Sequence, residues 1–218
     1  MTTISISRNH DFQSRLPPWH NKIHGMECAL TKGKSIYMTT NPTEPIRTRV
    51  RRLYVPEAIY FITSNIQDRQ PYFANAENVL LLRQTMRAVK EFHPFQMRAY
   101  AFMPDHIHLL IFVLAATNIS KLMQSVKRNF TRNYKDKWGV NGAVKFWQRS
   151  FYDHVIRDER DYLNHIHYIH YNPVKHGYVS RPEDYAHTSY HEYVRLGWYD
   201  AGLTEAVGTE WMELYPDL

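Results

Sequence analysis

The stretch that decides the fold is FQMRAYAFMPDHIHLLIFV, residues 95–113. Apolar, aromatic and β-branched side chains dominate residues 95–103 and 106–113, and only Pro104-Asp105 separates the two runs. Two strand-like runs joined by so tight a connection are typical of a β-hairpin. The sequence therefore predicts two antiparallel strands in the middle of the chain.

Elements of both kinds flank this hairpin in a regular order. Residues 58–64, AIYFITS, have the β-branched and aromatic content of a strand, and residues 76–91 repeat apolar side chains at helical spacing. In chain order we expect a strand at 58–64, a helix at 76–91 capped by Asn75, the hairpin, a helix capped by Asn118 or Ser120 and ending near 138, a strand within 151–157, a helix from 158 or 159 to about 172, and a short helix near 189–196. This order predicts an α+β fold, a ferredoxin-like split βαβ sandwich whose antiparallel sheet carries helices on one face, plus a C-terminal tyrosine-bearing helix.

The 218 residues fit one domain with extensions. We expect an N-terminal arm over residues 1–52, a compact domain over 53–180 and a C-terminal tail over 181–218. The arm mixes Ser, Thr, Asn and Pro without a sustained period, so we expect it to be partly disordered, and Met38 is a candidate alternative start.

Composition excludes several classes of protein. The single cysteine, Cys28, excludes an internal disulfide framework and a cysteine-based zinc finger. The longest apolar run, residues 109–116, is far shorter than the ~20 residues of a membrane-spanning helix, and the N-terminus has no signal-peptide pattern. We therefore expect a cytoplasmic protein without a membrane partner. A net charge of +6 favours a polyanionic partner.

His106 and His108 are the sharpest local feature. Side chains two residues apart on a strand point to the same face, with their Cα atoms about 6–7 Å apart. This arrangement suits two ligands of one divalent metal ion, while Ile107 points the opposite way, toward the helices. The alternative is two surface or half-buried histidines that bind nothing.

Tyr168 and Asn172 are four residues apart in the segment DYLNHIHYIHYNPVKHG, residues 161–177, and so share one helical face, with His165 near it. A tyrosine can act as a covalent nucleophile in phosphoryl transfer, and the Asn172 carboxamide oxygen would complete a metal shell begun by the two histidines. The alternative is that Tyr168 is an ordinary amphipathic tyrosine of the core or surface.

The helix near 120–138 is locally basic, with Asp136 as its one acid, which suits phosphate contacts unless it is simply a solvated face. Trp147, Gln148 and Arg149 suit contacts with unpaired bases, although the aromatic ring would equally suit a core. The residues assigned to DNA binding are Arg51, Arg52, Lys121, Lys127, Arg128, Arg132, Lys135, Trp147, Gln148, Arg149 and Lys175. His154 and His165 are assigned as auxiliary site residues, with structural histidines as the alternative.

Three segments together resemble a known family. MPDHIHLL at 103–110, WQRSFYDH at 147–154 and YIHYNPVKHG at 168–177 occur in the order found in REP-associated tyrosine transposases, which belong to the single-tyrosine HUH (His-hydrophobic-His) transposase superfamily. The resemblance spans roughly residues 60–193, and the ordered trio is far more specific than any one segment.

The resemblance implies a ferredoxin-like enzyme that nicks and rejoins single-stranded DNA beside an imperfect hairpin. It implies that His106 and His108 hold Mg²⁺ or Mn²⁺, that Tyr168 forms a 5′-phosphotyrosine link and releases a 3′-OH, and that Asn172 is the third polar ligand. The better-known insertion-sequence relatives carry Gln at that last position. The N-terminal arm and the crowding of His165, His167 and His170 around the tyrosine are further departures.

Two alternatives belong to other functional classes. One is a domesticated hairpin-binding protein that no longer cleaves, and the other is a metal-dependent nuclease that uses water while Tyr168 is structural. The sequence leaves the oligomeric state open between monomer and homodimer.

Overall fold

The computed structural model describes residues 54–114 and 117–199. The predicted arm at 1–52, including Arg51 and Arg52, and residues 200–218 lie outside the described residues. Residues 54–156 and 160–199 belong to one compact unit. Within the described ranges, no helix is long and apolar enough to cross a membrane.

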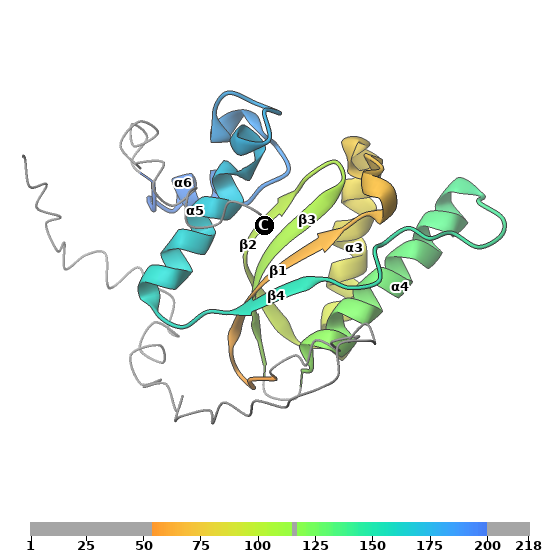
Figure 1. Cartoon of the computed structure of the whole chain (residues 1–218), viewed down its shortest axis with the longest axis horizontal. Coiled ribbons are helices and arrows are strands. Elements are labelled where there is room, and N and C mark those ends of the chain that lie inside the picture. Colours follow the sequence, from red (N-terminus) through yellow and green to blue (C-terminus); the bar gives the residue numbers. More distant parts are fainter. Residues whose placement is uncertain (1–53, 115–116, 200–218) are drawn as a thin grey trace, which may run out of the picture. The chain divides into compact units, whose positions relative to one another are not determined.

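The centre of the unit is a four-stranded sheet with the order β2-β3-β1-β4 (Figure 1). Its strands are β1 (Ile59–Asn65), β2 (Phe95–Phe102), β3 (His106–Val113) and β4 (Tyr152–Val155). Every neighbouring pair is antiparallel. The predicted hairpin is β2–β3, closed where the Met103 N–H donates to the His106 carbonyl over 2.9 Å.

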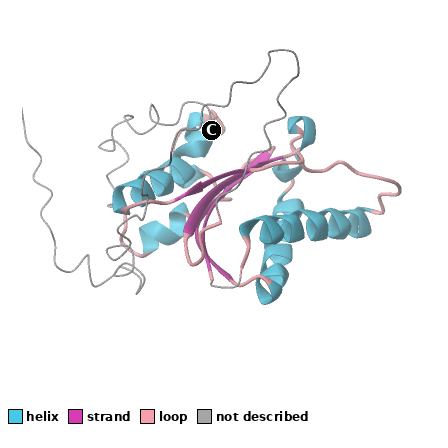
Figure 2. Cartoon of the chain, turned by 60° about the horizontal axis from the view of Figure 1, so that its bottom comes forward, coloured by secondary structure: helices cyan, strands magenta, loops and turns pink. Residues whose placement is uncertain are grey.

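Helices cover both faces of this sheet (Figure 2). On one face lie α3 (Ala76–Phe92) and α4 (Ile119–Trp138), each of which connects two strands. On the other face lies α5 (Glu159–Lys175), with the short α6 (Tyr190–Arg195) beyond it; the remaining elements are short 3-10 turns at Gln67–Arg69, Tyr72–Ala74 and Pro182–Asp184. The β-α-β-β-α-β order followed by a tyrosine-bearing helix confirms the predicted split βαβ class.

Because side chains alternate along each strand, the sheet has an apolar face toward α3 and α4 and a second face toward α5, here called the chemical face. Tyr60, Ile62, Ile107 and Leu109 point toward α3 and α4 and belong to the main core cluster. Each large apolar side chain buried there contributes about 1.5–3 kcal/mol of transfer free energy. The alternate residues of the same strands, including His106 and His108, point toward α5. The register of the strands therefore decides which face of the sheet carries the histidines.

The helix starts follow the expected capping chemistry. The Asn75 side chain accepts a hydrogen bond from the Glu77 N–H at the start of α3, and Asn118 accepts from the N–H groups of Ser120 and Lys121 at the start of α4. Of the two candidate caps for α4, Asn118 is therefore the one used.

The predicted end of α5 near Asn172-Pro173 is wrong, because the helix continues through Pro173 to Lys175. Proline lacks one N–H and disfavours a helical residue before it, but burial of both Asn172 and Pro173 overrides that preference. The last turn closes when the His176 N–H donates to the Asn172 carbonyl over 3.0 Å, and Gly177, at φ 70°, ends the helix. This additional turn carries Lys175 and His176 to the chemical face.

Candidate active site

The two histidines of β3 converge at their Nε2 atoms, which are 3.1 Å apart. Both side chains are almost fully buried. The His106 Nδ1–H donates to the Asp105 carboxylate over 2.6 Å, and His108 Nδ1 is hydrogen-bonded to the Thr63 hydroxyl over 2.9 Å. Thr63 is the direct partner of His108 in the β1–β3 register. Each ring is therefore oriented through Nδ1, with Nε2 directed to a common point.

These contacts constrain the protons of the pair. A carboxylate only accepts hydrogen bonds, so His106 has a proton on Nδ1, and one proton lies between the two Nε2 atoms. The Thr63 hydroxyl can either donate to the His108 Nδ1 or accept from it. Burial, followed by the charges of His106 and His176, holds the pKa of His108 well below its usual range. Its imidazole is thus neutral, as a metal ligand must be.

Asp105 extends the arrangement outward. Its second carboxylate oxygen lies 3.3 Å from the Arg69 guanidinium. Burial acts to raise the pKa of the Asp105 carboxyl, but its hydrogen bond to His106 and the His106 and Arg69 charges lower it overall. A carboxylate that holds the outer nitrogen of a ligating histidine raises the basicity of the inner one.

Tyr168 and Asn172 of α5 lie over the histidine pair. The Tyr168 ring meets the His108 ring edge-on at 5.2 Å between centroids, and it is 1% exposed. Burial raises the pKa of Tyr168 to about 12, and the Asn172 amide partly offsets this. Both polar atoms of the Asn172 side chain are buried and lack a partner in good hydrogen-bond geometry, although the amide is close enough to Tyr168 and His108 to affect the pKa of each.

The donor set fits a divalent metal ion. Adjacent ligands of an octahedral ion at about 2.1 Å are separated by about 3.0 Å, which matches the two Nε2 atoms. The buried amide of Asn172 could supply an oxygen ligand to such an ion. A buried polar group without a partner costs about 1–3 kcal/mol of stability. Imidazole and amide oxygen together suit Mn²⁺ and also accept Mg²⁺.

Two further side chains at the end of α5, the Lys175 ammonium and the His176 imidazole, also reach this region. The Lys175 Nζ lies 5.2 Å from the centre of the Tyr168 ring, and the His176 ring lies 5.1 Å from the His106 ring. Sequence reasoning assigned Lys175 to DNA binding and missed His176. The i, i+4 spacing from Asn172 to His176 is the signal that would have found it, had the helix not been ended at Asn172.

His154 and His165 do not join the histidine pair. Both contact Asp161, and the Phe61 ring lies between His165 and His108, at centroid distances of 4.6 and 5.6 Å. They form a separate group on the same side of the sheet.

The residues assigned to DNA binding are distributed over three places. Lys121, Arg128, Arg132 and Lys135 lie on the face of α4 opposite its buried residues. The helix α4 itself lies on the face of the sheet opposite α5, which carries Tyr168 (Figure 2). The Lys127 ammonium donates to the carbonyls of Gln148 and Ser150, so it ties the loop before β4 to α4.

Trp147 and its neighbours form the second place, on that loop, and Lys175 at the active site is the third. The Trp147 ring is half-buried against Phe73 and Phe130. The Gln148 side chain accepts from the Asn65 amide over 3.3 Å, and Arg149 is exposed. In this place the exposed guanidinium is therefore the group best presented to a phosphate.

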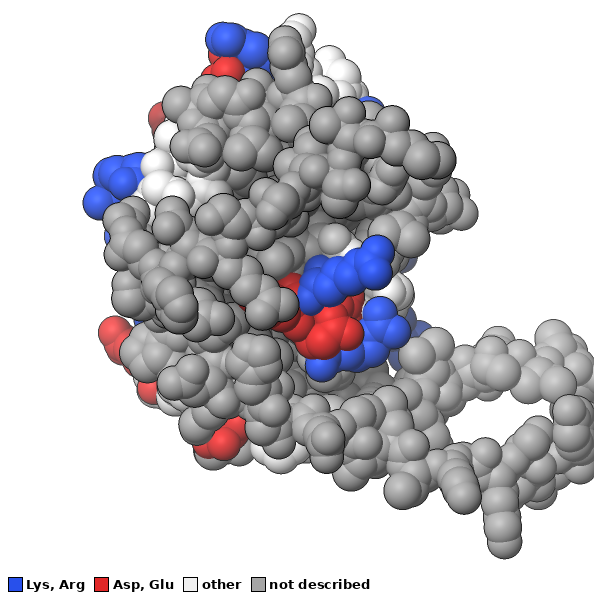
Figure 3. Space-filling model, turned by 90° about the vertical axis from the view of Figure 1, so that its left-hand side faces the viewer, with Lys and Arg blue, Asp and Glu red and all other residues white. Residues whose placement is uncertain are grey.

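The charge near α5 is mixed. Figure 3 shows the side of the unit that carries α5, and the described Lys and Arg side chains visible near its centre lie against Asp and Glu side chains. The outer face of α4 differs, because its row of cations includes no acidic side chain until Asp136.

Comparisons with known proteins agree on one family. The sequence profile described as "Transposase IS200 like" matches residues 55–172. A REP-associated tyrosine transposase of Escherichia coli is 30% identical over 150 residues, which cover 68% of this chain and 86% of that protein. A Haemophilus influenzae protein that provisionally carries the same name is 33% identical over 157 residues, covering 66% and 86%.

A solved structure is similar as well. It is a REP-associated tyrosine transposase bound to a REP hairpin, with a TM-score of 0.61 and 29% sequence identity. The match covers 69% of this chain and 87% of that one. The similarity therefore extends over most of both chains rather than over an isolated motif.

Proposed function

Because the chain belongs to the IS200-like transposase family, we propose that this transposase is a metal-dependent endonuclease and strand transferase for single-stranded DNA beside a REP-like hairpin. The observation that carries the proposal is the convergence of four side chains from two elements: His106 and His108 from β3, and Tyr168 and Asn172 from α5. The two pairs of residues are far apart in sequence and differ in chemistry, and together they offer the nucleophile and the metal ligands of a metal-assisted phosphoryl transfer to tyrosine.

His106, His108 and Asn172 are the residues that would hold Mg²⁺ or Mn²⁺, which when bound polarises the scissile phosphate and offsets its developing negative charge. For His108 to ligate through Nε2, its proton has to lie on Nδ1. Thr63 allows this change, because a hydroxyl that donates to Nδ1 can turn and accept from it. Asp105 keeps the His106 proton on Nδ1 throughout.

Tyr168 is the nucleophile of the proposal. Its hydroxyl oxygen forms a bond to the phosphorus while the bond from phosphorus to the 3′ oxygen breaks, and the proton lost by the phenol balances the one gained by the released 3′-OH. The 5′-phosphotyrosine link conserves the phosphodiester, so rejoining needs no external energy source. With a pKa of about 12 the phenol is protonated at neutral pH, and the nearby Lys175 ammonium favours the anion that forms on attack.

The DNA class follows from the relatives. The solved relative is bound to a REP hairpin, and 29% identity over most of both chains supports the same class of ligand here. The cationic outer face of α4 and the exposed Arg149 suit the hairpin backbone, whereas the cleaved single strand has to reach the opposite, α5 side of the sheet.

The test is a covalent trap. Full-length protein is incubated with a hairpin-bearing single strand and Mg²⁺ or Mn²⁺, and the protein–DNA adduct is resolved on a denaturing gel. We expect Tyr168→Phe to abolish the adduct while hairpin affinity stays within about threefold, since the hydroxyl is removed and the ring packing is kept. Tyr171→Phe, three residues along the same helix, is the matched control and should form the adduct normally.

Each of the other possible results of this experiment supports a different hypothesis. An adduct that survives Tyr168→Phe would disprove the assignment of the nucleophile. Metal-dependent cleavage by the unmodified protein without any adduct would identify a water-using nuclease. Hairpin binding without cleavage would identify a protein that keeps the fold and has lost the reaction.

A further inference from the structure

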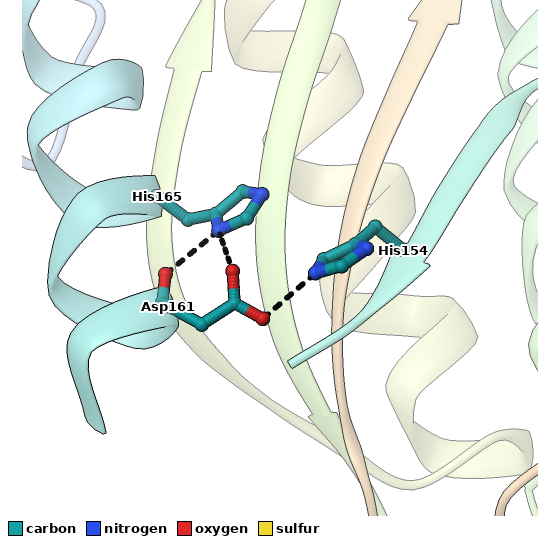
Figure 4. Close-up of side chains that lie close together, drawn as sticks. All are labelled: His154, Asp161 and His165. Atoms are coloured by element: carbon teal, nitrogen blue, oxygen red, sulfur yellow. Dashed lines mark hydrogen bonds and ion pairs between the residues drawn. The ribbon is translucent and has the colours of Figure 1, made fainter. Parts of the chain in front are cut away.

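His154, Asp161 and His165 form a second cluster of metal-ligating side chains, here called the His154 cluster (Figure 4). His154 lies on β4, and the other two lie four residues apart on α5. The His154 Nε2 is 2.8 Å from one Asp161 carboxylate oxygen. The His165 Nδ1 is 2.7 Å from the Asp161 backbone carbonyl and 3.2 Å from the other carboxylate oxygen. One candidate ligand atom from each residue lies within 4.8 Å of the others.

Burial sets this cluster apart from ordinary surface histidines. Asp161 is 3% exposed and His165 is 1% exposed, while His154, on the edge strand, is half-buried. A buried carboxylate is costly unless hydrogen bonds or a cation compensate it. The two imidazole rings are nearly parallel, with an angle of 15° between their planes and centroids separated by 4.9 Å. Each ring has a nitrogen close to the Asp161 carboxylate.

The ligand types and spacing match a transition-metal ion. Two imidazoles and one carboxylate suit Zn²⁺, Mn²⁺, Co²⁺ or Ni²⁺ better than Ca²⁺ or Mg²⁺. Adjacent ligands of a tetrahedral zinc ion at about 2.05 Å are separated by about 3.3 Å. The observed nitrogen–oxygen distances of 2.8 and 3.2 Å are shorter than this, so the three side chains are close enough to ligate one ion after a small outward shift.

The His154 cluster is distinct from the active site. Phe61 separates the two, with its ring stacked on His108 at 5.6 Å and tilted against His165 at 4.6 Å. Asp161 is seven residues before Tyr168, which is about 10 Å along the axis of α5. No residue of the cluster has a part in the proposed cleavage.

We propose that the His154 cluster binds a second divalent transition-metal ion, through one nitrogen of each histidine and the Asp161 carboxylate. For binding, each imidazole presents a lone pair to the ion at the nitrogen that now donates a proton. That proton moves to the other ring nitrogen, so each ring remains neutral. The ion joins the edge strand β4 to α5. Because Phe61 packs against both His165 and Tyr168, the ion also holds the tyrosine helix against the sheet.

The test counts bound ions with the histidine pair removed. Full-length His106→Ala/His108→Ala protein is stripped with a chelator, and Zn²⁺ and Mn²⁺ are each titrated by calorimetry, with the melting temperature recorded alongside. We expect this variant still to bind one ion of at least one of the two metals, and saturation to raise its Tm by about 5 °C or more.

Added substitutions assign that ion. His154→Gln on the same background should weaken binding at least tenfold and remove the Tm shift, and Asp161→Asn should do the same. His154 is the preferred change because its half-exposed position makes folding less sensitive than at Asp161. His93→Gln, at the end of α3, is the matched control and should leave the binding unchanged, which excludes a general loss of histidines as the cause.

Two results would overturn the proposal. One is a folded His106→Ala/His108→Ala protein, judged by circular dichroism, that binds neither metal. The other is binding that His154→Gln leaves unaltered, which would place the ion elsewhere and leave the His154 cluster as a purely hydrogen-bonded group. Failure of the proposed function is separable, because it alters cleavage and metal binding at the intact histidine pair without changing this count.

Discussion

At the scale of single residues, the candidate site is organised by groups that orient ligands rather than by the ligands alone. Asp105 and Thr63 hold the outer nitrogens of His106 and His108, and these contacts direct both Nε2 atoms to one point. Asn172 differs from the two histidines, because its buried amide has no partner in good hydrogen-bond geometry in the folded chain. Such a group reduces stability and is retained where a ligand uses it.

Asp105 provides a prediction about metal affinity. We expect Asp105→Asn to weaken Mn²⁺ binding by about 10–100-fold, because an amide orients the ring without supplying the negative charge that makes Nε2 basic. Calorimetric titration of chelator-treated protein measures the change. Asp184→Asn, at an exposed carboxylate remote from the site, is the control, and equal affinities for the two variants would contradict the role of Asp105.

Asn172 provides a prediction in which stability and activity change in opposite directions. Asn172→Leu removes a buried, unsatisfied amide at similar volume, so the free energy of unfolding without metal should rise by about 1–2 kcal/mol. Adduct formation should be lost in the same variant. Urea unfolding in the presence of a chelator measures the first effect, and a drop in stability would show that the amide is satisfied in solution.

At the scale of elements, α5 is the part that brings the site together, and it is held from two sides. Tyr168 and His165 contact Phe61 of β1, while His170 faces the C-terminal segment. There the His170 Nε2 is 2.7 Å from the Ser189 hydroxyl and its Nδ1 is 2.8 Å from the Tyr199 hydroxyl. The segment before and after α6 is thereby fastened to α5.

His170 predicts how stability depends on pH. Burial lowers the pKa of His170 to about 3 in the folded chain, whereas its ordinary value is about 6.5. Between these two pH values, His170 is therefore protonated in the unfolded chain and neutral in the folded chain. The contribution of His170 is therefore complete above pH 6.5 and declines as the pH falls toward 3, by up to about 1.4 kcal/mol per pH unit.

The measurement is a set of urea titrations from about pH 7.5 to about pH 4, which covers most of the range in which His170 titrates. We expect His170→Phe to flatten the pH dependence relative to the unmodified protein, even if its stability at neutral pH is lower. The half-buried His93, changed to Gln, is the control and should leave the slope as it was. A slope that His170→Phe leaves unaltered would mean that another group carries the acid sensitivity.

At the scale of the whole molecule, the sheet lies between the cationic surface of α4 and the candidate active site around Tyr168. The helix α4, whose outer face is cationic, is on one side of the sheet, and α5, which carries Tyr168, is on the other (Figure 2). A hairpin held at α4 has to send its single strand around the sheet to reach the tyrosine. Affinity for the hairpin and the rate of the chemical step should therefore respond to different residues.

Arg128 and Arg132 test that separation. Changing both to Ala should reduce the slope of log affinity against log salt by about 1 for each phosphate that the variant no longer neutralises, so by about 2 in total. The rate of adduct formation at saturating DNA should stay within about twofold. Lys175→Gln is the converse variant, with a slower adduct rate and a smaller change in salt slope, and identical behaviour of the two variants would contradict the separation.

Features that depend on neighbours along the chain could be predicted from the amino-acid order alone. Strand alternation placed His106 and His108 on one face, and polar side chains at Asn75 and Asn118 marked the starts of α3 and α4. The order of the elements was enough for the fold class, and the ordered motifs were enough for the family. Each of these follows from backbone geometry over a few residues, which periodicity reports directly.

Which distant groups meet was settled by packing in three dimensions. Packing carried α5 through Pro173 and so brought Lys175 and His176 to the site, against the local preference of the sequence. The β1–β3 register put Thr63 opposite His108, and the packing of α5 on the sheet left Asp161 between two histidines. The contact between Thr63 and His108 joins residues 45 positions apart, and burial rather than local propensity extends α5 through Pro173, so local patterns in the sequence reported neither feature.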